Sequence, residues 1–321
     1  MDIFLQQLIN GLVLGSIYAL VALGYTMVYG VLGLINFAHG EVLMVGALTA
    51  LSAVTALLGV NPDLHGAILL TVGLLAAVPV CVALSWTIER VAYRPLRNAP
   101  RLAPLITAIG VSIVLQTLAM IIWGRNYHIF PQTLSPEPIT LLLFPATAQM
   151  DYERSVSVTP IQVLIVVGAA ALMLGLTYLI NKTRLGKAMR ATAESPEIAS
   201  LMGINPNTVI SATFVIGAAL AGVAGVMVAA NYSIAHFYMG FLPGLKAFTA
   251  AVVGGIGNIY GAMLGGLLLG IVESLGAGYL GQLTGGFLGS NYQDIFAFAV
   301  LILVLTLRPS GILGEKVSDR A

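Results

Sequence analysis

Long apolar runs alternate with short polar stretches along the whole chain. A membrane-spanning helix needs roughly 20 apolar residues, and runs of about that length recur from one end to the other. We predict apolar helices, with boundaries good to a few residues, over 5–30, 37–59, 66–89, 103–124, 160–181, 208–230, 242–258, 261–283 and 292–307. Because the stretch 24–46 fits either a broken helix or a re-entrant pair, the expected total is eight to ten membrane segments.

A polar cluster interrupts the pattern in "GYTMVYGVLGLINFAHGEVLMVG", where Asn36, His39 and Glu41 lie between two apolar runs. Irregular backbone at membrane depth is tolerated only where protein or a water-filled cavity surrounds it. Two interpretations follow. The cluster forms the wall or gate of a translocation path, or it is a structural corner that ties two helices together.

Composition settles the class of protein. Of 321 residues, 58% are hydrophobic and 8% charged, and the mean hydropathy is +0.96. A soluble protein of this length lacks the polar residues to cover such a surface. We therefore expect an all-α polytopic membrane protein with one transmembrane domain over 1–321. The net charge of +1 gives no indication of nucleic-acid binding, and the single Cys81 excludes a disulfide framework. The first apolar run lacks a basic region and a cleavage site, so we expect a retained span.

Basic residues predict the orientation. Eleven of the fourteen Lys and Arg residues lie in the stretches 90–101, 182–190 and 308–320. The number of predicted spans between them places all three stretches on the cytoplasmic side, with the N-terminus opposite. The loop 125–159 then lies on the far face, as a short hairpin or an irregular cap.

The cytoplasmic loop 182–206 is too long and polar for a simple turn. Ser195 is a suitable N-cap, Pro196 suits the first helical position, Glu197 favours the helix dipole, and Gly203 fits the position after the helix. Asn207 is placed to cap the next span. The short helix has one apolar face, formed by Ile198, Leu201 and Met202. It either docks a cytoplasmic protein or lies on lipid.

Glycines recur at helical spacing in "VVGGIGNIYGAMLGGLLLG". This spacing lets membrane helices approach closely, and the glycines expected to pack are Gly257, Gly261, Gly265, Gly266 and Gly270. The chain contains no G-x-x-x-x-G-K-[ST] phosphate loop. We expect no nucleotide site, no cofactor and no metal site in this chain.

Ionisable residues within the spans are few: Glu41, Glu89, Lys246, Glu273 and Asp294. Each must face protein or a water-filled path, because charge is costly in lipid. Glu89 is interpreted as an interfacial residue and Asp294 as a helix cap. The residues assigned to a translocation path are Asn36, His39, Glu41, Lys246 and Glu273.

The two halves show a faint duplication. "NFAHGEVLMVGALTAL" and "GFLPGLKAFTAAVVGG" each contain an interrupted segment, a charged residue and a small-residue helix. The helices before them run in opposite directions in the predicted topology. This arrangement favours an inverted repeat over about 5–124 and 208–307, with a pathway at the interface between the two halves.

Four stretches together resemble the permeases of branched-chain amino acid ABC transporters, most closely the H-type subunit. They are "GLVLGSIYALVALGYTMVYGVLGLINFAHGE", "ASLMGINPNTVISATFVIGAALAGVAGV", "GLKAFTAAVVGGIGNIYGAMLGGLLLGIVE" and "RPSGILG". The resemblance implies an importer subunit in the bacterial inner membrane, paired with a second permease, commonly an M-type chain. It also implies two cytoplasmic ATPases, a periplasmic binding protein, and branched-chain amino acids as cargo. Urea and short-chain amide permeases share much of the pattern.

The resemblance also bears on the cytoplasmic helix. The importer docking loop is similar to E-x-A-x-x-x-G, which Glu197, Ala199 and Gly203 match, whereas Ile198 replaces the usual second alanine. The residues expected to couple to the ATPase are Glu194, Glu197, Ala199, Leu201 and Gly203.

Two other functions are alternatives to an importer subunit. An ion-coupled secondary transporter would use Glu41 and Glu273 as coupling carboxylates. An intramembrane enzyme would need a nucleophile with a base, or paired carboxylates, and no such motif is visible. We therefore expect a transport subunit and not an enzyme, with ATP hydrolysis in partner chains.

Overall fold

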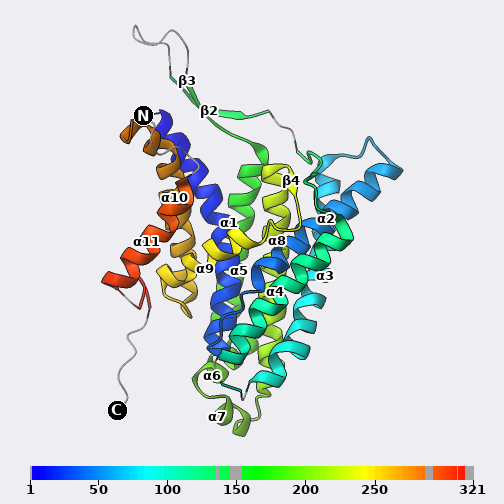
Figure 1. Ribbon diagram of the computed structural model, residues 1–321, viewed down its shortest axis with the longest axis vertical. Helices are drawn as coiled ribbons and strands as arrows, with labels where there is room; N and C mark the ends of the chain where they lie inside the picture. The colour runs from blue at the N-terminus through cyan, green and yellow to red at the C-terminus, as the bar shows by residue number, and fades with distance from the viewer. Residues whose placement is uncertain are drawn as a thin grey trace.

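The computed structural model describes residues 2–97, 99–100, 102–134, 137–144, 154–285, 292–308 and 310–314. Within these ranges the fold is a helical bundle (Figure 1). Seven helices are long and apolar enough to cross a membrane. They are α1 (Asp2–Leu32), α2 (His39–Val60), α3 (Gly66–Ile88), α4 (Leu102–Trp123), α5 (Pro160–Lys182), α8 (Pro206–Tyr232) and α10 (Ile259–Leu283). Two shorter apolar helices, α9 (Phe241–Gly254) and α11 (Gln293–Leu307), complete the predicted set. The prediction of an all-α polytopic membrane protein is confirmed.

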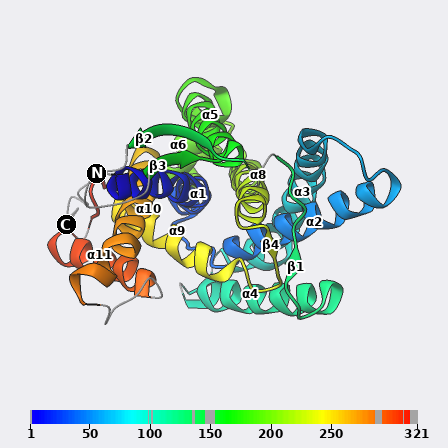
Figure 2. The ribbon, with the colours of Figure 1, turned by 90° about the horizontal axis from the view of Figure 1, so that it is seen from above.

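Helix α1 forms the centre of the bundle. It packs against α10, α8, α9 and α5 (Figure 2), and 89% of its apolar window is buried inside the protein. By contrast, the corresponding windows of α3, α4 and α5 are only 22–28% buried. A helix that is apolar on all sides can be buried in protein or face lipid. Here α1 and α8 form the protein core, and α3, α4 and α5 leave most of their apolar surface for lipid or a partner.

Two helix boundaries differ from the prediction. After Ile88 the chain continues as a π-helix, η1 (Glu89–Tyr93), and a 3₁₀ turn, η2 (Arg94–Leu96). This extension packs inward because Glu89 and Tyr93 are almost fully buried. Helix α9 stops at Gly254, short of the expected 258, because Gly255 takes a φ of +109° that ends the helix.

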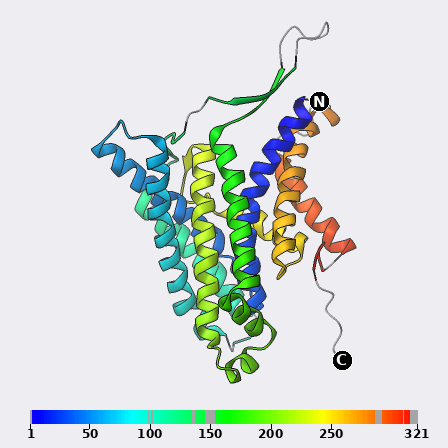
Figure 3. The same cartoon turned by 180° about the vertical axis from the view of Figure 1, so that it is seen from behind.

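The two ends of the bundle carry different elements (Figures 1 and 3). At one end lie the start of α1 and an antiparallel hairpin of β2 (Ile139–Phe144) and β3 (Arg154–Val158). The hairpin alternative for 125–159 is thus confirmed, and 145–153 lies outside the described residues. A second short pair joins β1 (His128–Ile129) to β4 (Ile234–Ala235).

The opposite end holds η1, η2, α6 (Arg184–Glu194), α7 (Pro196–Leu201) and the segment 310–314 (Figure 1). The described members of all three basic stretches therefore lie at one end, as the orientation argument requires. Arg101, Lys316 and Arg320 lie outside the described residues.

Candidate functional site

The chain leaves helical geometry between α1 and α2, over 33–38. Gly33, at φ +65°, ends α1. Asn36 then holds the break, because its Oδ1 accepts hydrogen bonds from the Ala38 N–H (3.1 Å) and from the Tyr93 hydroxyl (2.8 Å). These bonds satisfy polar groups that lipid cannot. The polar cluster in the sequence therefore marks a break between two helices, and Asn36 connects this break to η1.

His39 fills the corner where α2 begins. Its ring lies edge-on to Tyr25, with ring centroids 4.9 Å apart. A Cβ atom on Gly24 would come within 2.2 Å of the ring Nε2, so only glycine fits beneath it. The same Gly24 meets Gly217, where α1 and α8 cross. His39 thus sits at the crossing of the two central helices.

A second break separates α8 from α9. Ser233 adopts a left-handed conformation with φ 55°, and the chain turns back past His236, whose ring stacks on Tyr127 at 4.5 Å. Partial burial lowers the pKa of His236. Helix α9 begins only after this segment, at Phe241.

The N-termini of α2 and α9 meet. A Cβ atom on Gly40 would lie 2.6 Å from the carbonyl oxygen of Gly240, and one on Gly244 would lie 2.8 Å from the Cα of Gly40. Backbone therefore touches backbone at this junction. Two broken helices point their positive ends at one region of the protein.

A cavity of about 270 Å³ lies beside this junction, between α1, α2, α4 and α9. Glu41, which is 1% exposed, contributes its carboxylate to the lining. Its Oε1 accepts hydrogen bonds from Ser112 Oγ (3.1 Å) and Gln116 Nε2 (2.7 Å), while Oε2 has no partner among the described residues. The rest of the wall is Tyr25, Phe37, Gly40, Ile109, Ile113, Tyr238, Gly240, Phe241, Gly244 and Leu245.

Lys246 and Glu273 form a separate buried cluster. Lys246 Nζ lies 2.5 Å from Glu273 Oε1 and 2.6 Å from Asp294 Oδ1. The Tyr18 hydroxyl donates to Glu273 Oε2 at 3.1 Å. The cluster thus joins α1, α9, α10 and α11. Asp294 lies in the first turn of α11, as expected of a cap, but its described contact is an ion pair.

The surface helix forms as the sequence predicts. Ser195 Oγ accepts from the N–H of Ile198 at 3.3 Å, Pro196 starts α7, and Gly203 takes φ +83° beyond its end. Ala199 faces inward at 2% exposure. The exposed side chains include those of Glu194, Glu197, Ile198, Leu201 and Met202. An unpartnered apolar surface therefore lies at the end of the bundle.

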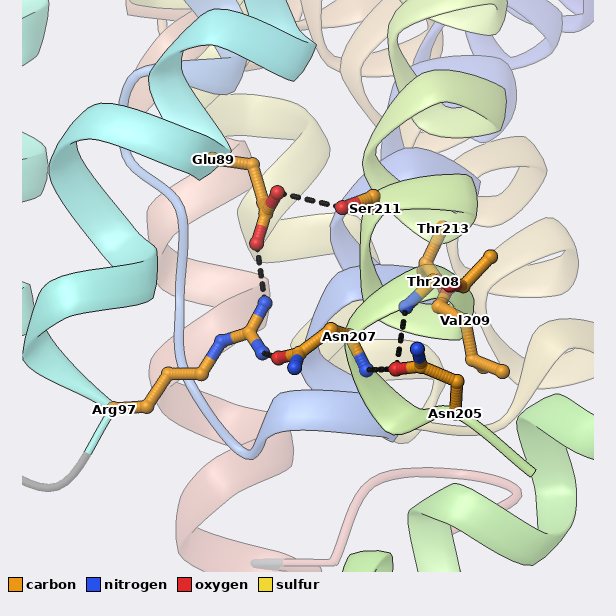
Figure 4. Close-up of polar contacts among 8 residues, drawn as sticks. All are labelled: Glu89, Arg97, Asn205, Asn207, Thr208, Val209, Ser211 and Thr213. Atoms are coloured by element: carbon orange, nitrogen blue, oxygen red, sulfur yellow. Dashed lines mark hydrogen bonds and ion pairs between the residues drawn. The ribbon is translucent and has the colours of Figure 1, made fainter. Parts of the chain in front are cut away.

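A polar network joins η1 and Arg97 to the start of α8 (Figure 4). Buried Glu89 accepts hydrogen bonds from Arg97 and, at 2.7 Å, from the Ser211 hydroxyl. Arg97 also donates to Asn207 Oδ1. Burial lowers the pKa of the Arg97 guanidinium, and the neighbouring carboxylate of Glu89 opposes this shift.

One expectation is wrong here, and another gains a partner. Glu89 lies at the end of the bundle that carries the basic stretches, where it is buried and paired with Arg97. The cap of α8 is Asn205, whose Oδ1 accepts from the N–H groups of Asn207 (3.0 Å) and Thr208 (3.4 Å). Asn207 instead connects α8 to the segment after α3.

The glycines of α10 divide between two neighbours. A Cβ atom on Gly261 or Gly265 would clash with the backbone of α9, and one on Gly266 or Gly270 with the backbone of α1. Gly257 differs from the expectation. It lies in the turn before α10, where its φ of +94° needs glycine.

The structure therefore separates the predicted path residues. Glu41 lines the cavity, Asn36 and His39 build the corner behind it, and Lys246 pairs with Glu273 elsewhere. Sequence reasoning missed Ser112 and Gln116. Their signal was available, because two polar residues at i and i+4 share one face of an otherwise apolar helix.

Together these features define a class: a multi-pass membrane protein with two broken helices around an internal cavity and a helix exposed at one end. Comparison with known proteins gives the family. A family model described as branched-chain amino acid transport system / permease component matches residues 7–305. The chain belongs to this family.

Full-length relatives agree with this assignment. The permease protein LivH of a high-affinity branched-chain amino acid transport system from Escherichia coli (strain K12) is 46% identical over 317 residues, 99% of this chain and 97% of LivH. BraD from Pseudomonas aeruginosa, named in the same terms, is 48% identical over 99% of this chain and 98% of BraD. Among solved structures, PsaBC from Streptococcus pneumoniae in complex with Fab shows a TM-score of 0.47 at 13% identity, covering 94% of this chain and 91% of that chain.

Proposed function

We propose that this chain is the transmembrane permease subunit of an ATP-driven importer for branched-chain amino acids. The observation that carries the proposal is the near full-length identity of 46–48% to permeases named for such systems. The cargo follows those relatives. The chain itself is a transport subunit without catalytic chemistry, and partner chains hydrolyse ATP.

The translocation path runs past the cavity at Glu41. In transporters, substrate sites lie where broken helices meet within the membrane, and here the N-termini of α2 and α9 meet beside that cavity. Asn36 and His39 act on the path by fixing the break. Lys246 and Glu273 act by holding α9 against α10 and α11.

The two halves form an inverted repeat, over about 5–124 and 208–307. Support comes from the order of elements: each half has a long helix, a break, a helix that starts at the junction, and two further helices. Helices α1 and α8 are antiparallel, because Gly24 meets Gly217 whereas Gly30 and Thr213 line one pocket further along.

Coupling to an ATPase uses the loop 182–206, with Glu194, Glu197, Ala199, Leu201 and Gly203 as its contact residues. The exposed apolar side chains of α7 suit a protein partner. The network of Glu89, Arg97 and Asn207 connects the start of α8, just after α7, to η1. ATP-driven rocking of one part of the bundle against another then alternates access to the cavity.

The expected partners are a second permease, commonly an M-type chain, two cytoplasmic ATPases and a periplasmic binding protein. The location is the bacterial inner membrane. The basic stretches face the cytoplasm by the charge rule, which puts α7 on the ATPase side and the β2–β3 hairpin on the binding-protein side.

Reconstitution tests the proposal. The complex is placed in proteoliposomes with ATP inside and binding protein outside, and uptake of radiolabelled leucine, urea and acetamide is measured. The proposal predicts leucine uptake that needs both ATP and binding protein. Uptake of urea or acetamide without uptake of leucine would retain the ATP-driven importer and change only its substrate. Uptake driven by an ion gradient without ATP would replace the importer with a secondary transporter.

A further inference from the structure

The carboxylate of Glu41 lacks the cation that every other buried glutamate in the described part of the chain has. Glu89 pairs with Arg97, and Glu273 with Lys246. Glu41 has no ion pair among the described residues, and its Oε2 has no hydrogen-bond donor there, although the side chain is 1% exposed. A buried carboxylate is costly unless it is paired. The missing hydrogen-bond donor at Oε2 therefore points to a ligand that supplies one.

The surroundings hold this carboxylate in one orientation. Ser112 and Gln116, one turn apart on α4, both donate to Oε1. Two donors on Oε1 leave Oε2, which is buried beside the cavity, as the oxygen to which an ammonium group can donate. A charge-assisted bond of this kind is stronger than one between neutral groups.

The same cavity offers a site for an anion at the start of α9. The first N–H groups of a helix have no partner within the helix. At the start of α9 the Phe241 N–H makes only a long 3.4 Å bond to the Tyr238 carbonyl, and the Leu242 N–H has no partner among the described residues. Pro243 has no N–H, and the Gly244 N–H donates to the Gly240 carbonyl at 2.9 Å, so the donors are those of Phe241 and Leu242. Gly240 and Gly244 line the cavity there without side chains to cover the backbone. A carboxylate is favoured at such a helix end.

Helix α2 does not compete for that anion. The N–H of His39 donates to the Asn36 carbonyl at 3.0 Å, and those of Glu41 and Val42 donate to the Ala38 carbonyl at 3.1 and 3.2 Å. These three N–H groups at the start of α2 are thus already paired by the break. The cavity therefore has a negative end at Glu41 and a positive end at α9.

We propose that this cavity binds an aliphatic α-amino acid as its zwitterion, with the ammonium group on Glu41 Oε2 and the carboxylate on the first turn of α9. The remaining wall is apolar, from Phe37, Ile109, Ile113 and Leu245, and takes the aliphatic side chain. The volume of about 270 Å³ suits a small ligand, since pockets for drug-sized molecules span roughly 300–1,000 Å³. This inference rests on the importer function proposed above and names the site within it.

Occupancy of the cavity is the measurement that tests the site. A reporter cysteine replaces Ile113 at the cavity wall in the assembled complex, and its modification by a thiol reagent is timed. The native Cys81 is fully buried, and the parent chain gives its background. At a leucine concentration about nine times its Kd, modification is expected to slow about tenfold, because about a tenth of the sites are then empty. Two analogues serve as controls: 4-methylpentanoate lacks the ammonium group, and 3-methylbutylamine lacks the carboxylate.

The proposal predicts that neither analogue protects as leucine does, and that Glu41→Gln abolishes protection by leucine. Equal protection by 4-methylpentanoate would overturn the assignment of Glu41, and this comparison needs no variant at that position. Equal protection in Glu41→Gln would overturn it independently. Leucine uptake by the wild-type complex distinguishes a failure of the proposed site from a failure of the proposed importer function. If ATP-driven leucine uptake is present but leucine protects the reporter cysteine equally in wild type and in Glu41→Gln, the proposed site is wrong and the importer function is retained. If uptake is absent, the proposed function itself fails.

Discussion

Single residues within the spans act in pairs that the sequence alone does not reveal. The unusual residues were visible, because a charge in an apolar run stands out. Their partners were not, since Asn36 meets Tyr93, and Glu89 meets Arg97 through a π-helical turn that no periodicity predicts. Glu41 was identified from the same signal, but the lack of a cation beside it, among the residues that the structure describes, emerges only when every neighbouring element is in place.

The pair of Lys246 and Glu273 gives a prediction at this scale. Lys246→Met leaves Glu273 buried without its cation, so we expect a loss of about 3–5 kcal/mol in stability. The measurement is the thermal unfolding of the purified complex. Adding Glu273→Leu should restore part of the loss, because both buried charges are then gone. An unchanged melting temperature in Lys246→Met would show that the cluster is not a structural tie.

At the scale of elements, the length of the apolar runs was enough to predict the helices. The break between α1 and α2 was predicted from the polar cluster of Asn36, His39 and Glu41. The surface helix and its cap at Ser195 followed from local chemistry. The sequence of 125–159 fits a hairpin or an irregular cap, and the structure has the hairpin. The end of α3 did not, because the buried Glu89 and Tyr93 extend the chain inward through tertiary contacts.

The contact between α10 and α1 depends on glycine. A Cβ atom on Gly270 would lie 2.2 Å from the backbone nitrogen of Gly15, so Gly270→Val forces the two helices apart. Overpacking of this kind costs roughly 1–3 kcal/mol or more. The matched control is Gly175→Val on α5, where a Cβ atom meets nothing within 4 Å. Yield and thermal stability of the complex should fall for the first variant only, and equal behaviour would contradict the packing.

The surface helix gives a second prediction for an element. Glu197→Lys reverses an exposed charge in the first turn of α7, where a cation opposes the helix dipole. We expect co-purification of the ATPase to be lost and leucine uptake to fall at least about tenfold, the effect of roughly 1.4 kcal/mol. Asp63→Lys makes the same charge change on an exposed loop between α2 and α3. A docking role is refuted if the two variants retain the ATPase equally.

The whole molecule combines two broken helices from opposite halves of the chain. Sequence suggested the duplication, but the meeting of Gly40 with Gly240 and Gly244 could not be derived from it, since contact between residues two hundred positions apart depends on how all the helices pack. The proposed translocation path depends on the cavity beside that meeting point.

The most direct test asks whether this cavity changes sides with the ATP cycle. Ile113→Cys is modified by a membrane-impermeant thiol reagent from outside, in proteoliposomes that hold the complex nucleotide-free or trapped with ATP and vanadate. The account predicts faster modification in the ATP-trapped state, because ATP binding opens the path outward. Equal rates in the two states would contradict it, and the cavity at Glu41 would then not be part of an alternating path.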